Sequence, residues 1–267
     1  MKLTIVSVNY HSEVYCNTNI TIFNKINKGT NLEYDWYIVD NNLKELPCEK
    51  LDPKFKILTG HKERVEAIRL PNEALIECGS IHHGLGINIG LKQLDILEIN
   101  KSDLFLVTDP DFILSETIES VYNIMMENNY NFYGAAYMPG KKRMIRNFPA
   151  AFCQFINPKI INPLKLDYRA AFDNQPYHKY YPDCGHRIMH QYKTNKHDYC
   201  AMSSDQDPRE DYVRYPNLGY HMHMKIHTNQ ATLHSTTQKV GKEEGREVIH
   251  KKLFRKIYKE IKHGENK

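Results

Sequence analysis

The chain has 267 residues, of which 41% are hydrophobic and 25% charged, and its formal net charge at pH 7 is +4. This length fits one large α/β domain, and no apolar run approaches the ~18 residues that a membrane-spanning helix needs. Six scattered cysteines without a Cys-x-x-Cys pair favour reduced thiols over a zinc site. Because Met1 leads almost directly into an apolar segment, we expect no signal peptide and a cytoplasmic location.

The first hundred residues alternate between short apolar runs and segments with helical spacing. Strands are predicted at residues 3–8, 35–39 and 55–58, and helices at residues 14–26 and from the glycine-rich residues 79–91 to about Ile99. This alternation predicts an α/β fold with a mainly parallel sheet flanked by helices. Ligands of such sheets bind at the carboxyl ends of the strands, which is where Asn9, Asp40 and Asp109 fall.

Residues 104–112, Leu-Phe-Leu-Val-Thr-Asp-Pro-Asp-Phe, are the most informative stretch. Their apolar part predicts a buried strand, which Pro110 ends because proline cannot donate to a sheet. Asp109 and Asp111 would then repel each other unless a cation lay between them, and carboxylate oxygens are ligands that Mg²⁺ and Mn²⁺ prefer. The alternative is a solvated turn, since Asp-Pro-Asp also suits turns. In either case Asp111 is expected on a solvent-facing loop.

The chain continues with further predicted elements. Ser115 is expected to cap a helix that extends to about Asn128, with Glu116 in its first turn. Strands are expected at residues 131–137 and 150–156.

This order of parts resembles the nucleotide-sugar glycosyltransferases of the GT-A fold, near the large family-two type. The resemblance covers roughly residues 1–140 and rests on four segments: Ile-Val-Ser-Val-Asn-Tyr, Tyr-Ile-Val-Asp-Asn-Asn, Gly-x-Asn-x-Gly-Leu at residues 86–91, and Asp-Pro-Asp. It implies one GT-A domain over residues 1–238, with a nucleotide-sugar-binding half (1–140) and an acceptor half (141–238). The implied activity is metal-dependent transfer of a hexosyl or pentosyl group from a nucleotide-diphosphate sugar to an acceptor hydroxyl.

The resemblance also implies roles for individual residues. Asn9 and Asp40 would contact the base or ribose, and Asp109 the ribose. With Asp111, Asp109 would also bind the Mn²⁺ or Mg²⁺ that bridges the diphosphate. His83, beside His82 at the start of the glycine-rich helix, would contact the diphosphate unless these histidines only cap the helix. Asn88 on the same helix is a further candidate for binding the donor.

Two more candidates lie in the second half. Asp183 precedes a short helical segment, where inverting relatives carry a general base that deprotonates the acceptor hydroxyl, although a simple helix cap explains it too. The Glu-Asp pair usual in the family is absent, which leaves the base and the stereochemistry open, with Asp173 and Asp205 as reserves. His221 and His223 would share one face of a strand, where a late histidine often completes the metal site in GT-A enzymes.

The positive charge is concentrated at the C-terminus. Residues 239–267 hold ten Lys and Arg against five Glu, and their apolar residues recur at helical spacing. This pattern predicts a basic amphipathic helix. Its apolar stripe either packs on the domain, or the helix contacts a membrane surface or nucleic acid phosphates.

The expected acceptor is a saccharide, a lipid-linked group or a protein. The composition, rich in Lys, Asn, Ile and Tyr, resembles that of AT-rich phage genomes, so a hydroxymethylated or glycosylated DNA base is an alternative acceptor. The basic residues 141–147 and the C-terminal helix would then hold phosphates. Two other functions remain: a nucleotidyltransferase, which would need a glycine-rich basic loop after the first strand, and a non-catalytic nucleotide-sugar-binding module.

Overall fold

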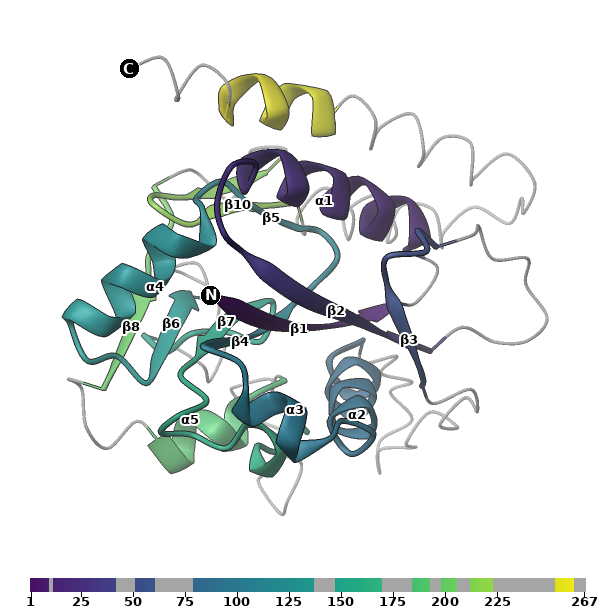
Figure 1. Ribbon diagram of the computed structural model, residues 1–267, viewed down its shortest axis with the longest axis vertical. Coiled ribbons are helices and arrows are strands. Elements are labelled where there is room, and N and C mark those ends of the chain that lie inside the picture. The colour runs from purple at the N-terminus through teal and green to yellow at the C-terminus, as the bar shows by residue number, and fades with distance from the viewer. Residues whose placement is uncertain are drawn as a thin grey trace, which may run out of the picture.

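A computed structural model of the chain describes residues 1–9, 12–41, 51–60, 79–136, 147–169, 184–192, 198–205, 212–222 and 253–261, with the side chains of residues 79–82 excepted. Within these ranges a seven-stranded sheet forms the centre of the molecule, and helices lie on both sides of it (Figure 1).

The sheet is mainly parallel, as predicted. Its strands, in chain order, are β1 (Lys2–Asn9), β2 (Glu33–Asp40), β3 (Lys56–Thr59), β4 (Leu104–Thr108), β6 (Phe132–Ala135), β7 (Cys153–Ile156) and β8 (Tyr199–Met202). Their spatial order is β3-β2-β1-β4-β7-β6-β8, and only β7 runs antiparallel to its neighbours. The carboxyl ends of β1, β2 and β4 therefore meet at one edge.

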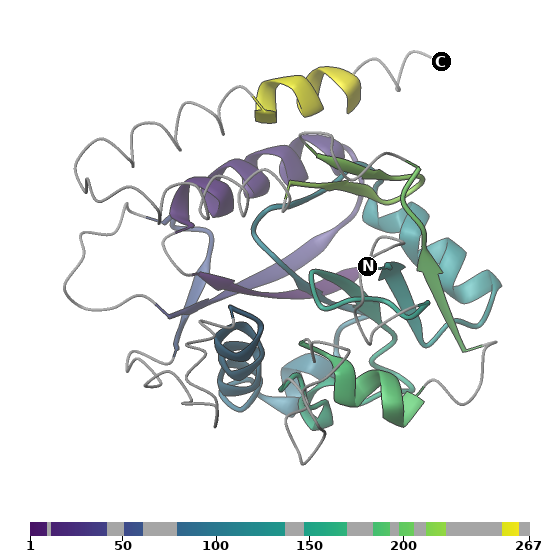
Figure 2. The same cartoon turned by 180° about the vertical axis from the view of Figure 1, so that it is seen from behind.

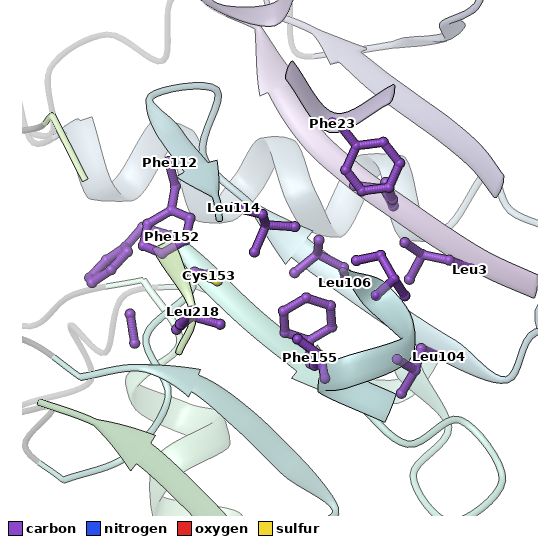
Figure 3. Close-up of a cluster of buried hydrophobic side chains, with 14 of the residues drawn as sticks. Leu3, Phe23, Leu104, Leu106, Phe112, Leu114, Phe152, Cys153, Phe155 and Leu218 are labelled. Atoms are coloured by element: carbon purple, nitrogen blue, oxygen red, sulfur yellow. The ribbon is translucent and has the colours of Figure 1, made fainter. Parts of the chain in front are cut away.

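Helices bury both faces of the sheet, which explains why consecutive residues of β1 and β4 are buried rather than alternately buried and exposed. Helices α1 (Glu13–Ile26) and α4 (Ile118–Glu127) cover one face, and α2 (Gly79–Leu91), α3 (Ile96–Asn100) and α5 (His186–Tyr192) cover the other. A 3₁₀ turn, η1 (Pro163–Lys165), follows β7. Figure 3 shows the first face, where Phe23 of α1 packs near Leu3 and Leu106 of the sheet.

Two predicted helix boundaries are wrong. The glycine-rich helix ends at Leu91, and α3 starts anew where the Asp95 carboxylate accepts a hydrogen bond from the Leu97 N–H at 2.8 Å. The helix α4 is capped by Thr117 rather than Ser115, because Ser115 N–H donates to the Leu218 carbonyl and so belongs to a strand end.

A second, three-stranded sheet was not predicted. It consists of β5 (Phe112–Leu114), β10 (Gly219–His221) and β9 (Val213–Tyr215), all antiparallel, and is called the small sheet below. Its strand β5 begins directly after Asp111, and the Asp111 side chain is only 15% exposed. The prediction that Asp111 lies on a solvent-facing loop is therefore wrong.

Residues 253–261 form a helix, the C-terminal helix, that lies along α1 in both views (Figures 1 and 2). Its apolar residues Leu253, Phe254, Ile257 and Ile261 are buried against the domain, while its basic residues Arg255, Lys256 and Lys259 are exposed. The apolar stripe therefore packs on the protein in this segment. The boundary predicted at residue 239 lies outside the described residues. Among the helices that the structure describes, none has the length and apolar character of a membrane span.

Candidate functional site

The carboxyl edge of the main sheet carries three of the predicted residues. Asn9 and Asp40 are register partners at the ends of β1 and β2, and Asp109 follows β4, which pairs with β1 on its other side. The backbone fixes Asp109, because its N–H donates to the Phe152 carbonyl of the neighbouring turn at 3.0 Å.

Three predicted metal ligands converge at this edge. Asp109, Asp111 and His221, here called the metal triad, each offer one ligand atom, and these atoms lie within 4.8 Å of one another. The chain turns tightly through Pro110, with Phe112 N–H donating to the Asp109 carbonyl. Strand pairing of β5 with β10 then sets Phe112 opposite His221, which brings His221 Nε2 to 3.5 Å from Asp111 Oδ1.

The surroundings of the metal triad hold it in place and suit a cation. The His221 ring is buried and stacks on Phe152 at 4.2 Å between centroids, with 10° between their planes. Neighbouring ligands of an octahedral ion are about 3.0 Å apart, so the 3.5 Å spacing of Asp111 and His221 is close to what Mn²⁺ or Mg²⁺ needs. Two carboxylates with one imidazole form a donor set for a hard or borderline divalent cation.

His83 lies against the metal triad. Its Nε2 is 2.9 Å from Asp109 Oδ1, which is an ion-pair distance when the imidazole is protonated. The two atoms are not aligned as a hydrogen bond, and neither buried atom has a hydrogen-bond partner among the described residues. Burial by itself would lower the pKa of His83, but the Asp109 carboxylate and the Cys184 thiol outweigh it and raise that pKa well above its usual value. Asp109 Oδ1 thus faces the positive charge of His83, and a cation bound at this oxygen would take the place of that ion pair.

Asn9 has a supporting place rather than an exposed one. It is fully buried, its Nδ2 donates to Glu13 Oε1 at 3.0 Å, and its Oδ1 accepts from the Ser12 N–H and hydroxyl. These bonds fix the start of α1 at the sheet edge, and the Asn9 amide also lies 3.5 Å from Asp40 Oδ1. Direct contact of Asn9 with a nucleoside stays a prediction. The buried Glu13 was missed, because its position in a helical pattern gives no sign of this bond.

A second buried amide at this edge, Asn41, was also missed. A Cβ on Gly60 would lie 2.2 Å from Asn41 Oδ1, and one on Gly86 would lie 2.5 Å from Asn41 Nδ2. A Cβ on Gly90 would meet Val39 at 2.3 Å. The glycines of α2 are thus needed for its close approach to the strand ends.

Asn88 points to the segment after η1. Its Nδ2 donates to Asp167 Oδ1 at 2.9 Å, and its Oδ1 accepts from the Tyr168 N–H at 2.9 Å. Burial would raise the pKa of Asp167, but hydrogen bonds from Arg169 and Asn88 hold it well below its usual range. A role of Asn88 in donor binding stays a prediction.

Most of the remaining candidate residues lie outside the part of the chain that the structure describes. Asp183, Asp173 and His223, the His82 side chain and residues 141–146 lie outside the described residues. The helix α5 that follows Asp183 begins at His186. Asp205 is described, and its Oδ2 lies 3.6 Å from Arg214 Nη1.

No protein-family model and no curated protein sequence matches the chain. Similar solved structures include S. aureus TarS 1-349, with 12% identity over 66% of this chain and a TM-score of 0.37. They also include the galactosyltransferase LgtC in complex with donor and acceptor sugar analogs. It has 11% sequence identity over 76% of this chain and 73% of that chain, with a TM-score of 0.40. A third is the mannosyltransferase PcManGT from Pyrobaculum calidifontis in complex with GDP-Man and Mn²⁺. It has 9% sequence identity over 64% of this chain and 48% of that chain, with a TM-score of 0.38.

The chain spans about half the length of the TarS structure, 52%. LgtC and PcManGT are named as glycosyltransferases, the class that the sequence resembles. With TM-scores of 0.37 to 0.40 these likenesses carry no argument about activity, which has to rest on the site itself.

Proposed function

We propose that the protein is a metal-dependent glycosyltransferase of the GT-A type, which moves a sugar from a nucleotide-diphosphate sugar to an acceptor hydroxyl. The observation that carries the proposal is the metal triad at the carboxyl edge of a mainly parallel sheet, the same edge at which β2 ends with Asp40. An α/β sheet binds its ligands at this edge, and a carboxylate-rich cation site there suits a diphosphate.

Each part of the site has one task in this reaction. Asp109, Asp111 and His221 would hold a Mn²⁺ or Mg²⁺, which supplies positive charge to stabilise the leaving diphosphate. Asp40 would bind the nucleoside, with Asn9 and Asn41 fixing the backbone and side chains around it. The remaining rate acceleration would come from positioning, because holding the acceptor hydroxyl against the anomeric carbon removes most of the entropy cost of bringing them together. Asp183 is the proposed base for that hydroxyl.

The acceptor is proposed at the level of a hydroxyl-bearing saccharide, lipid-linked group or protein. A nucleotidyltransferase is disfavoured because Asn-Tyr-His-Ser at residues 9–12 is not a glycine-rich basic loop. The described site gives no specific support to a DNA acceptor, which remains a prediction from composition.

The test is a thermal-shift screen of the full chain with UDP-, GDP-, CDP- and dTDP-sugars, each with EDTA or Mn²⁺, followed by hydrolysis assays on every donor that binds. Metal-dependent release of nucleoside diphosphate, lost in Asp111→Asn and kept in Asp35→Asn, supports the proposal. Asp35 is a matched control because it is a carboxylate of similar exposure (21%) near the opposite end of β2. Metal-dependent binding without turnover would instead indicate a binding module, and release of pyrophosphate from nucleoside triphosphates would indicate a nucleotidyltransferase.

A further inference from the structure

The metal triad is assembled from two different sheets. Asp109 directly follows β4 of the main sheet, whereas Asp111 immediately precedes β5 and His221 ends β10 in the small sheet. The spacing of the three ligands therefore depends on how the small sheet sits against the main one. A shift of about 0.5 Å between them is enough to impair a site of this kind.

The small sheet is packed between two apolar clusters. Residues that point inward belong to the main core (Phe112, Leu114, Val213, Tyr215), where Phe112, Leu114 and Phe152 lie together in Figure 3. The alternate residues point outward, as strand periodicity requires (Ile113, Tyr212, Tyr220, Met222). This outer face is buried in one cluster with Leu253, Phe254, Ile257 and Ile261 of the C-terminal helix. The helix is thus the outer wall of the small sheet.

Specific contacts link the helix, through Tyr212 directly before β9, to the strand that carries His221. The Tyr212 hydroxyl donates to Glu260 Oε1, and Lys256 Nζ lies 5.0 Å from the centre of the Tyr212 ring. Tyr212 in turn packs edge-on against Tyr220 at 5.7 Å, and Tyr220 is the residue before His221.

The helix is itself anchored on the domain. Phe254 packs near Tyr15 of α1 at 6.2 Å, and Lys25 Nζ of α1 lies 4.6 Å from the ring centre of Tyr258. The helix is therefore held on α1 as well as on the small sheet.

We propose that the C-terminal helix positions the metal site. On this inference, which rests on the proposed metal-dependent function, Ile257 and Glu260 hold the small sheet at the spacing where Asp111 and His221 meet Asp109. Neither residue touches the cation or the substrate, so both act through the strands. Loss of their contacts should weaken cation binding more than an equal loss of stability elsewhere would.

The test measures Mn²⁺ binding to the full chain by electron paramagnetic resonance, with Mn²⁺ alone as the probe and at a temperature well below all unfolding midpoints. Ile257→Ala is compared with Ile99→Ala. Both isoleucines are buried (0% and 1% exposed), but Ile99 lies in α3, in the cluster on the other face of the main sheet. The two variants should lose similar stability, whereas only Ile257→Ala should weaken Mn²⁺ binding, by about tenfold or more, the range typical of groups that support metal ligands.

A second pair keeps the test decisive if Ile257→Ala does not fold. Glu260→Ala removes the acceptor of the Tyr212 hydroxyl and should weaken Mn²⁺ binding, while Glu260→Gln keeps an acceptor and should restore it. Equal Mn²⁺ affinity in Ile257→Ala and Ile99→Ala, or in Glu260→Ala and wild type, overturns the positioning role. If wild-type protein itself binds no Mn²⁺ that depends on Asp111, the metal site and the proposed function fail instead.

Discussion

Replacing Asp111 by asparagine should separate metal binding from folding. The substitution preserves shape and one oxygen ligand but removes one of the two negative charges that face the cation. Mutating a residue that only hydrogen-bonds to a metal ligand typically lowers metal affinity by about 10–100-fold. Loss of the charge of a direct ligand should therefore lower Mn²⁺ affinity by at least about 100-fold, or ~2.7 kcal/mol.

The metal-free protein should tolerate this change. Two carboxylates within 4.8 Å repel each other by something on the order of 3 kcal/mol at an effective dielectric constant near 20. Removing one of them relieves this repulsion, which offsets the contacts that Asp111 loses. In EDTA we therefore expect the unfolding temperature of Asp111→Asn to lie within about 2 °C of the wild-type value.

Added Mn²⁺ should then distinguish the two proteins. At a Mn²⁺ concentration of about 100 times the wild-type Kd, binding stabilises wild type by ~2.7 kcal/mol, or about 5–10 °C for a chain of this size. At the same concentration Asp111→Asn should gain only ~0.4 kcal/mol, about 1 °C. Differential scanning calorimetry measures both gains, with Asp35→Asn as the charge control. If Asp111→Asn gains as much as wild type, the metal assignment is refuted.

Three further outcomes follow from the structure. Because hydrogen bonds hold the pKa of Asp167 below its usual value of 3.8, this carboxylate stabilises the fold above about pH 4 and loses that effect as the pH falls. Urea titrations should therefore show Asp167→Asn less stable than wild type at pH 7 and a smaller difference near pH 2. Gly219→Ala should cost about 1–3 kcal/mol and weaken Mn²⁺ binding, because its Cβ would lie 2.2 Å from the Ile113 carbonyl and force β10 away from β5; unchanged stability would contradict the strand pairing. Tyr168→Phe should cost about 1–3 kcal/mol in chemical denaturation, because it leaves Gln154 Oε1, now 2.6 Å from the hydroxyl, without that buried donor. A loss below a few tenths would count against that bond.

The amino-acid sequence determined the parts of this protein that depend on neighbours in the chain. Short segments rich in apolar, β-branched and aromatic residues predict strands, so β1, β2 and β4 and their polar ends at Asn9, Asp40 and Asp109 followed from local pattern. The end of the strand at Pro110 and the closeness of Asp109 to Asp111 in the chain were local in the same way, and the two carboxylates predicted either a cation site or a solvated turn.

Only the tertiary structure decided what these residues meet. Strand β5 is three residues long, too short for any periodicity, and it exists because β10 pairs with it from more than a hundred residues away. The same pairing sets His221 against Asp111, and packing of α2 places His83 on Asp109. Asn9 looked like a ligand residue, yet its amide is bonded to Glu13 and Ser12, which a strand-end position cannot foretell. Such contacts depend on which distant segments share a core. Which segments pack together depends on the apolar surface buried over the whole chain, because the apolar faces of distant segments must all be removed from water at once.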